Sequence, residues 1–227
     1  MKITNEDNMD LMARYEDNYF DLAIVDPPYG IARFGNRVEL SNRLCKSAKL
    51  NEWDIKPSPE YFKELFRVSK NQIVWGANNF TLPESEYFLI WDKHQTVDNF
   101  ASAEYAWTNC KKPAKVFRYS IHKTMADRKS EGGKIHPTQK PVKLYEWLLM
   151  NYAQRKCSHK HRESERYLCT DCRNSDVKIL DTHLGSGSIA IACHNLGYDL
   201  TACELDKEYY EAAMKRIEQH KQQIRMF

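Results

Sequence analysis

The sequence contains no run of apolar residues long enough to span a bilayer, which excludes a helical membrane protein. It also lacks a basic-then-apolar leader, because its first residues are polar and acidic. No internal repeat or low-complexity segment is present, which excludes a repeat array. A chain of 227 residues is long enough to bury a sizeable core, so we expect one domain over residues 1–227.

Cysteine is present, but not in the pattern of a disulfide framework. The seven cysteines are scattered and odd in number, whereas small secreted folds pair theirs. We therefore expect a protein of the reducing cytoplasm that does not bind membranes. The net charge of +3 is also low and does not by itself indicate a partner. The sequence does not determine the oligomeric state, and a homodimer is compatible with it.

The tetrapeptide Asp26-Pro27-Pro28-Tyr29 directly follows an apolar run at residues 22–25, which predicts a strand that ends there. Proline donates no hydrogen bond to a sheet, so two prolines terminate the strand and stiffen the turn. Open α/β sheets bind ligands at the carboxyl ends of their strands. A carboxylate, rigid carbonyls and a ring at such an end suit a planar heterocycle held by its exocyclic amino group. The alternative is a strand-ending turn with a solvated carboxylate.

A second pattern, near the C-terminus, is that of a nucleotide-binding unit. It predicts a strand, a loop, a helix, a strand and a helix at residues 177–181, 182–188, 189–196, 199–203 and 207–220. Gly185 and Gly187 let the loop approach a ligand, and the helix N-terminus attracts its negative group. Glu204 follows at the spacing where an acid reaches ribose hydroxyls. One alternative is a Rossmann dehydrogenase, but such an enzyme would have this unit at the start of the chain, whereas here it is at the end. The other alternative is a structural turn between strand and helix, with a solvated Glu204.

The third block is the hexapeptide His-Pro-Thr-Gln-Lys-Pro at residues 136–141. It is polar, rigid at both ends and rich in side chains that can bind a ligand. The following run at residues 142–152 predicts a helix, because several apolar residues share one face at helical spacing: Leu144, Trp147, Leu148 and Tyr152.

Together these blocks resemble the β-group of S-adenosylmethionine-dependent DNA amino-methyltransferases, of the adenine-specific phage or prophage type. The order agrees, since in that group the Asp-Pro-Pro-Tyr block precedes the cofactor-binding half, a circular permutation of the motifs. The resemblance spans nearly the whole chain. It implies an α/β fold with a three-layer, Rossmann-like methyltransferase sheet that is mostly parallel and has one antiparallel strand.

The resemblance also implies site residues. The catalytic residues would be Asp26, Pro27, Pro28 and Tyr29. Residues that bind S-adenosylmethionine would be Asp7, His136, Thr138, Gln139, Lys140, Asp181, His183, Gly185, Ser186, Gly187, Ser188, Glu204 and Leu205. The chain departs from the usual pattern in having Thr182 and His183 where the family has Pro and Phe, which leaves cofactor packing near His183 open. It also has little room for a long target-recognition insert.

The tetrapeptide suggests a mechanism. An aromatic exocyclic amine is a poor nucleophile, because its lone pair is delocalised into the ring. The Asp26 carboxylate and the Pro27 carbonyl can accept its two hydrogens, and Tyr29 can stack on an extruded base. Together with the resemblance, which favours adenine because Asp26 rather than Ser heads the tetrapeptide, this predicts methylation of the adenine amino group in DNA. The alternatives are cytosine amino (N4) methylation, an RNA substrate, and a non-catalytic cofactor-binding subunit that binds DNA.

The middle of the chain supplies the rest of the predicted sheet. Ser58 and Pro59 predict the start of a helix that runs to residue 68. Strands are predicted at residues 72–75, 87–91, 103–108 and 114–119. We interpret the last two as a hairpin, and we assign Trp75 and Trp91 to the core rather than to base stacking.

Basic residues gather in two segments. The first directly follows the tetrapeptide and holds Arg33, Arg37, Arg43, Lys46 and Lys49 against one acid, Glu39. Residues 111–143 hold ten Lys and Arg against two acids, a net charge of +8. Clustered cations near a base-binding crevice suit a phosphate backbone, and the alternative is a solvated lysine-rich loop. The DNA-binding residues we expect are Arg33, Arg37, Lys111, Lys112, Arg118, Lys123, Arg128, Lys129 and Lys134.

About twenty residues separate the helix at 142–152 from the strand at 177–181, more than the connection requires. The segment at 156–174 is too polar to form a core, and it contains the spacing Cys-x-x-Cys. We expect a small insert with a structural zinc, held by Cys157, Cys169, Cys172 and one of His159 or His161. The alternative is an exposed insert with incidental thiols.

Overall fold

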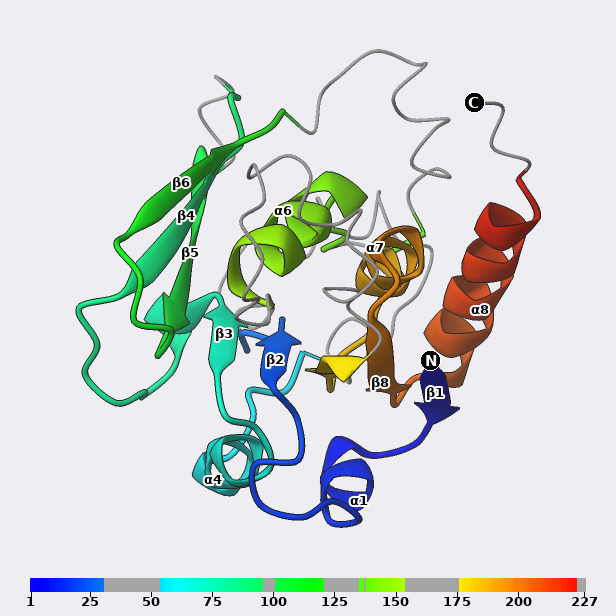
Figure 1. Cartoon of the computed structure of the whole chain (residues 1–227), viewed down its shortest axis with the longest axis horizontal. Helices are drawn as coiled ribbons and strands as arrows, with labels where there is room; N and C mark the ends of the chain where they lie inside the picture. The colour runs from blue at the N-terminus through cyan, green and yellow to red at the C-terminus, as the bar shows by residue number, and fades with distance from the viewer. Residues whose placement is uncertain (31–53, 96–100, 121–134, 137, 154–175, 224–227) are drawn as a thin grey trace.

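The computed structural model describes residues 1–30, 54–95, 101–120, 135–136, 138–153 and 176–223 (Figure 1). Within these ranges, eight strands form one sheet in the order β1-β8-β7-β2-β3-β5-β4-β6. The strands are β1 (Lys2–Asn5), β2 (Leu22–Val25), β3 (Gln72–Trp75), β4 (Phe88–Asp92), β5 (Ala103–Thr108), β6 (Lys115–Arg118), β7 (Lys178–Asp181) and β8 (Asp199–Glu204).

All strand pairs are parallel except those that β5 makes with β3 and β4. The prediction of a mostly parallel sheet with one antiparallel strand is therefore confirmed. The four residues of β2 and the four of β3 are all buried, as expected for strands covered on both faces. Continuous apolar runs, rather than alternating patterns, thus mark the centre of this sheet.

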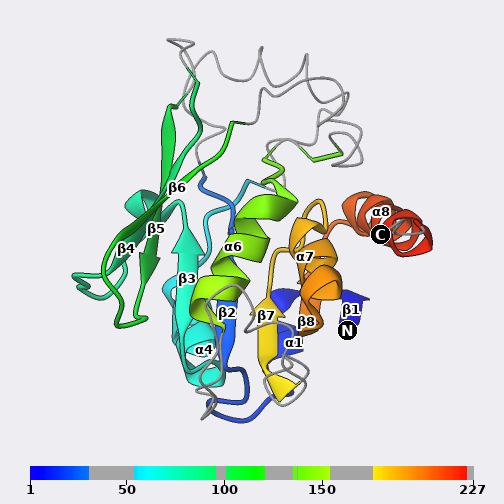
Figure 2. The ribbon, with the colours of Figure 1, turned by 45° about the horizontal axis from the view of Figure 1, so that its top comes forward.

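Helices cover both faces of the sheet. On one side lie α1 (Asn8–Met12) and α4 (Pro59–Val68), and on the other α6 (Val142–Tyr152) and α7 (Ser188–Leu196) (Figures 1 and 2). The last helix, α8 (Lys207–Gln222), lies near the β1 edge and adds Ala213 and Ile217 to the core on the α7 side. The predicted three layers are confirmed.

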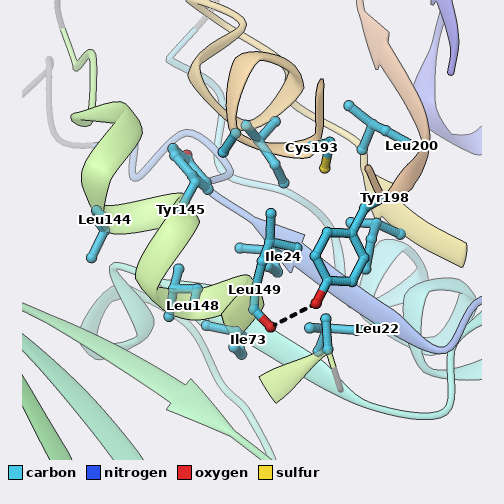
Figure 3. Packing of buried hydrophobic residues seen from close by; sticks show 14 of the residues in the cluster. Leu22, Ile24, Ile73, Leu144, Tyr145, Leu148, Leu149, Cys193, Tyr198 and Leu200 are labelled. Carbon is cyan, nitrogen blue, oxygen red and sulfur yellow. Dashed lines mark hydrogen bonds between the residues drawn. The ribbon is translucent and has the colours of Figure 1, made fainter. Parts of the chain in front are cut away.

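The larger core cluster lies between the sheet and α6 and α7. Leu22 and Ile24 of β2 pack near Leu148 and Leu149 of α6 (Figure 3). The Tyr198 hydroxyl donates to the Leu149 carbonyl across 3.2 Å, so its polar atom is satisfied within the cluster. The alternate residues Ala23 and Val25 face the α1 and α4 side, as the period of a strand requires.

Most predicted elements are present at the expected residues. Trp75 and Trp91 are both buried in the core, as predicted. Gly197 ends α7 in the left-handed conformation at φ +74°. The short helix α1 was not predicted, because five residues are too few to show helical periodicity.

The predicted hairpin is wrong. The strands β5 and β6 follow each other in sequence, but β4 lies between them in the sheet. β5 pairs antiparallel with β4, and β6 returns to pair parallel with the opposite edge of β4. The short polar connection between β5 and β6 therefore crosses over β4 instead of forming a hairpin turn. The pattern of apolar residues is the same for both arrangements, so it does not distinguish them.

Candidate active site

The two predicted motifs meet at the carboxyl edge of the sheet. Asp26 directly follows β2, and Asp181 ends β7. β2 and β7 are neighbours, with Leu22 opposite Ile179 and Ala23 opposite Leu180. Both strands run in the same direction, so the turn after β2 and the loop after β7 emerge side by side. This is the position at which open α/β sheets bind their ligands.

Both oxygens of the Asp26 carboxylate are engaged. The Tyr29 hydroxyl donates to Oδ1 across 2.6 Å. The Lys140 ammonium donates to Oδ2 across 2.5 Å and lies 3.0 Å from a Glu104 carboxylate oxygen. Only 2% of the Lys140 side chain is exposed. The catalytic turn is therefore fixed by a buried lysine that lies 114 residues away in sequence.

The charges alternate outward from Asp26. Lys140 contacts both carboxylates, and Lys93 contacts the other oxygen of Glu104 at 2.5 Å. Burial raises the pKa of Asp26, while the Lys140 charge opposes that rise. Burial would also raise the pKa of Glu104, but Lys140 and Lys93 together lower it to about 2. Burial lowers the pKa of Lys140, and the two carboxylates outweigh it, so its pKa is raised.

The Tyr29 ring is positioned by a glycine. A β-carbon on Gly76 would lie 2.1 Å from Cε1 of Tyr29, and Gly76 has φ +65°. The Phe80 ring stands edge-on to Tyr29, with centroids 6.1 Å apart. Gly76 is therefore required both for its backbone conformation and for the close approach of the ring. Burial raises the pKa of Tyr29 further above neutrality, so its hydroxyl stays protonated.

The glycine loop after β7 is held by side chains from β8 and α8. Glu204 accepts hydrogen bonds from the backbone amides of Gly185 (2.8 Å) and Asp206 (3.1 Å). Arg216 donates to the Ser186 carbonyl (2.8 Å) and the Ser188 hydroxyl (2.9 Å). Arg216 is only 5% exposed. Sequence reasoning missed Arg216, although its helical spacing from the buried Ala213 would place it on the inner face of α8.

The loop geometry fits a nucleotide-like cofactor. Gly185 and Gly187 both have positive φ, at +52° and +73°, and Gly187 is the N-cap of α7. A carboxylate, Glu204, lies within hydrogen-bond distance of this loop. Burial raises the pKa of Glu204, and the amides of Gly185 and Asp206 oppose the rise. Leu205, 68% exposed, follows it directly and offers an apolar surface.

The hexapeptide lies against the glycine loop. The His136 ring is 4.4 Å from the Tyr209 ring of α8, and a β-carbon on Gly185 would be 3.7 Å from it. The Thr138 hydroxyl lies 3.1 Å from His136 Nδ1, and Gln139 Oε1 accepts from the Ile135 amide. These side chains brace the segment beside the predicted cofactor loop.

The placement of Lys140 corrects a prediction. We expected Lys140 to bind the cofactor with the rest of the hexapeptide, but its ammonium reaches Asp26 and Glu104. The hexapeptide thus connects both motifs, with His136 beside the glycine loop and the Lys140 ammonium against Asp26 in the turn after β2. Residue types alone do not reveal this change of direction within five residues.

The departure at Thr182 and His183 forms a partly buried hydrogen-bonded chain. Asn8 Nδ2 lies 3.2 Å from His183 Nε2, and His183 Nδ1 lies 2.9 Å from the Thr182 hydroxyl. That hydroxyl is 2.6 Å from the Tyr61 hydroxyl. Burial lowers the pKa of His183 to about 3, so the ring is neutral. The chain joins α1 and α4 to the loop.

Two further predicted residues have structural contacts. Asp181 is buried, and burial raises its pKa to about 8. Its Oδ1 accepts the backbone amide of His183 across 3.0 Å. Asp7 caps α1 by accepting from the Met9 amide. Both carboxylates therefore help to shape the carboxyl edge beside β7 and β1.

The predicted DNA-binding residues divide by position. Arg118, 63% exposed, ends β6 on the carboxyl edge, where its Nε lies 3.6 Å from Asp92. Lys111 and Lys112 follow β5, which runs the opposite way, and Lys112 donates to the Asn151 carbonyl at the end of α6. These two lysines are therefore at the edge opposite Asp26, not on the catalytic side as we expected. The others lie outside the described residues: Arg33, Arg37, Lys123, Arg128, Lys129 and Lys134.

The predicted zinc ligands also lie outside the described residues: Cys157, His159, His161, Cys169 and Cys172. Among the residues that the structure does describe, no group of three or more His, Cys, Asp or Glu side chains could hold a metal ion. In the same ranges, no helix combines the length and apolar character needed to cross a membrane.

Comparison with known proteins extends these observations. A protein-family model described as DNA methylase matches residues 61–215. The type II methyltransferase M2.DpnII of Streptococcus pneumoniae is 24% identical and covers 96% of this chain and 90% of its own length. M2.MboI of Moraxella bovis is 23% identical, over 92% of this chain and 84% of its own length.

Solved structures share the fold at lower identity. A complex of M1.HpyAVI with SAM superposes with a TM-score of 0.53 at 17% identity, covering 95% of this chain and 98% of that one. The cytosine-N4-specific PvuII DNA methyltransferase gives 0.55 at 13% identity, covering 96% and 89%. At such identities the likeness concerns the arrangement of strands and helices.

Proposed function

Because the chain belongs to the DNA methylase family of amino-methyltransferases, we propose that it transfers a methyl group from S-adenosylmethionine to the exocyclic amino group of adenine in DNA. One observation carries the proposal: the Asp26 turn and the glycine loop emerge from neighbouring parallel strands, and the hexapeptide contacts both. A base held at the first would lie beside a cofactor held at the second. The enzyme would act in the cytoplasm.

Asp26 and Pro27 serve as the acceptors for the amino group. An ionised carboxylate has about four lone-pair sites, and Tyr29 and Lys140 occupy only part of that capacity. Accepting the two amino hydrogens draws the nitrogen toward a tetrahedral shape and frees its lone pair to attack the methyl group of the bound cofactor. The nitrogen–carbon bond would form as the bond between that methyl group and sulfur breaks, and the nitrogen would release one of its two hydrogens as a proton along its hydrogen bond to Asp26. Fixed acceptors need no reorganisation during the reaction, which is the main source of their effect.

Tyr29 stacks on the extruded base. Stacking contributes about 1–3 kcal/mol per base, which is similar to the few kcal/mol that base extrusion costs. In the structure its hydroxyl is bonded to Asp26, and its ring is confined between Gly76 and Phe80. The ring is thus already ordered before a base arrives.

The glycine loop would hold the cofactor, which supplies an electrophilic methyl group when bound. Glu204 would accept the ribose hydroxyls, while Gly185 and Gly187 let the backbone approach closely. Leu205 would cover a face of the adenine ring. His136, Thr138 and Gln139 would line the same site from the hexapeptide.

The choice of adenine rests on the Asp at the head of the tetrapeptide. Cytosine amino methylation is the nearest alternative, and one protein of similar fold is named as cytosine-N4-specific. Mass spectrometry of nucleosides decides between them, using DNA from methylation-deficient cells that express the chain. Detection of N6-methyladenine supports the proposal. Detection of N4-methylcytosine would show that the enzyme methylates cytosine instead of adenine. If a folded protein yields neither product, the proposal is refuted. Cells that express Asp26→Ala are the control.

Two finer proposals rest on the sequence. Arg118 and the basic residues outside the described ranges would contact DNA phosphates, so DNA affinity should fall steeply with added salt. The Cys and His residues of segment 156–174 would hold one structural zinc. Elemental analysis tests the zinc: about one ion per chain is expected, and a folded, metal-free protein would exclude it.

A further inference from the structure

The ion pairs behind the catalytic turn involve two residues that lie outside the tetrapeptide. Lys140 comes from the hexapeptide before α6 and Glu104 from β5, yet both reach the Asp26 site. Lys140 is almost completely buried, and a buried charge is stable only when it is paired. A buried lysine between two carboxylates, next to the group that accepts the reacting amine, calls for a functional explanation.

We propose that Lys140 and Glu104 are a positioning pair for Asp26, in which Lys140 keeps the carboxylate ionised and oriented while Glu104 holds Lys140 in place. This inference deepens the proposed function and depends on Asp26 acting there as the acceptor. It assigns to Lys140 and Glu104 a role in the catalytic turn rather than in cofactor binding.

The orientation follows from the two contacts of the carboxylate. Lys140 binds Oδ2 and Tyr29 binds Oδ1, so neither oxygen can rotate away without breaking a hydrogen bond. Lys140 is itself fixed between Oδ2 and Glu104, and its ammonium lies 5.6 Å from the centre of the Trp75 ring. Glu104 is anchored by its strand and by Lys93. Each member therefore limits the movement of the next.

The charge pattern explains why two residues are needed. Lys140 alone would stabilise the Asp26 anion strongly and weaken it as a hydrogen-bond acceptor. Glu104 shares the lysine charge, and its own negative charge acts on Asp26 in the opposite direction. The acidity of Asp26 is thus set by two neighbours of opposite sign, and removal of each should shift it in opposite directions.

Other groups near Asp26 must be held constant in any test. Tyr29 is bonded to it within the turn, Asp181 faces it from β7 and Tyr145 from α6, while Lys93 acts through Glu104. None of these side chains is itself substituted in the variants, but Glu104→Gln removes the charged partner of Lys93, and Lys140→Met removes a 3.4 Å contact with the Tyr29 hydroxyl. A difference between the variants is therefore assigned to the substituted residue together with these contacts.

The experiment compares Lys140→Met, Lys140→Arg and Glu104→Gln with the wild type. Single-turnover methyl transfer to genomic DNA from a methylation-deficient host is measured between about pH 5 and 9, a range that contains the ordinary and raised values of a carboxyl pKa. In Lys140→Met we expect the acidic limb of the rate profile to move up by about 1–3 pH units, because Asp26 loses its cation. In Glu104→Gln it should move to lower pH. Lys140→Arg should keep the limb near that of the wild type.

Cofactor affinity is measured in parallel by calorimetry and should change little in all three variants. Lys143→Met is the matched control, since Lys143 lies three residues further on, is 62% exposed and pairs with Glu146 away from the site. A rate that falls equally at all pH values in Lys140→Met, with an unshifted limb, would show that Lys140 only braces the fold. Limbs that move in the same direction in Lys140→Met and Glu104→Gln would also overturn the proposal.

The outcomes separate the two levels of inference. If the wild type transfers no methyl group to DNA, the proposed function fails, whatever the variants do. If the wild type is active and the limbs do not move, only the positioning pair fails. Should Lys140→Met not fold, as judged by circular dichroism, Glu104→Gln decides alone: a limb shifted to lower pH supports the pair, and an unshifted one rejects it.

Discussion

The glycine loop and the catalytic turn lie side by side on the sheet, but they are held in place in different ways. The loop after β7 is fixed by Glu204 and Arg216, which belong to the strand and helix that follow it. The turn after β2 is fixed by Glu104 and Lys140, which come from separate parts of the chain. One half of the site is a local unit, whereas the other is assembled from distant segments.

The two halves also differ in charge. The glycine loop is held largely through its backbone atoms, which bond to the partly buried Glu204 carboxylate and to the buried Arg216 guanidinium. Behind the turn after β2, charges of alternating sign run from Asp26 through Lys140 and Glu104 to Lys93; Lys140 is buried and the other three are partly buried. Because the two sets of contacts share few residues, substitutions on one side should affect methyl transfer and those on the other should affect cofactor binding.

Outside the tetrapeptide, the largest expected effect on the rate is at Gly76, on the catalytic side. In Gly76→Ala the new β-carbon would overlap the Tyr29 ring, so the ring must move. A displacement of about 1 Å can lower a rate by about 10²-fold, and we expect a loss of that size in single-turnover methyl transfer with unchanged cofactor affinity.

Gly197→Ala is the control for Gly76→Ala. Gly197 has a similar φ of +74°, but no atom lies within 4 Å of the added β-carbon. This variant should lose stability through backbone strain and keep its rate per folded molecule. Equal losses of rate in the two variants would contradict the role given to Tyr29.

On the cofactor side, Glu204→Gln replaces one acceptor oxygen by an NH₂ group. The amides of Gly185 and Asp206 each bond to a different oxygen, so one contact must be lost. We expect affinity for S-adenosylmethionine to weaken by about 1.5–3 kcal/mol, the range for hydrogen bonds to a charged group. Calorimetry measures the affinity, and the control is Glu208→Gln, an exposed residue in the first turn of α8. An unchanged affinity in Glu204→Gln would show that the cofactor does not bind at Glu204.

Arg216→Met tests the brace beneath the glycine loop. The Ser186 carbonyl and the Ser188 hydroxyl would each lose a buried donor, so the free energy of unfolding should fall by about 1–3 kcal/mol. Cofactor binding should weaken as well, because the loop loses its support. Denaturant titrations measure the stability, and the control is Lys215→Met, which substitutes the exposed neighbour and should change neither stability nor cofactor binding. An Arg216→Met protein as stable as the wild type would show that Arg216 does not support the loop.

A further expected effect concerns the pH dependence of stability. Burial raises the pKa of Asp181 from 3.8 to about 8, so the folded state binds its proton more tightly than the unfolded state. This carboxyl therefore contributes a decrease in stability as pH rises between about 4 and about 8. Asp181→Asn should become more stable relative to wild type over that window, by about 1 kcal/mol per pH unit. A difference in stability that stays constant with pH would contradict the shift.

The comparison also explains what the sequence could predict. The local unit was predicted almost completely, since the strand, glycine loop, helix and Glu204 follow one another in order. The partners of Asp26 were not, because Glu104 appears as an ordinary strand residue and Lys140 as part of the hexapeptide. The hairpin error has the same origin, since the pairing of β5 and β6 with β4 is decided by the whole sheet. Patterns in sequence indicate local structure well, but they do not indicate which distant charges will meet.

The most direct test of the division between the two halves is Asp26→Ala, with methyl transfer and cofactor affinity measured on the same preparation. We expect transfer to DNA to fall by about 10²-fold or more, since an acceptor aimed at the reacting amine is lost. Affinity for S-adenosylmethionine should remain within about twofold of the wild type, because the glycine loop keeps its contacts with Glu204 and Arg216. Wild-type turnover by Asp26→Ala, or a parallel loss of cofactor binding, would contradict the assignment of the two halves.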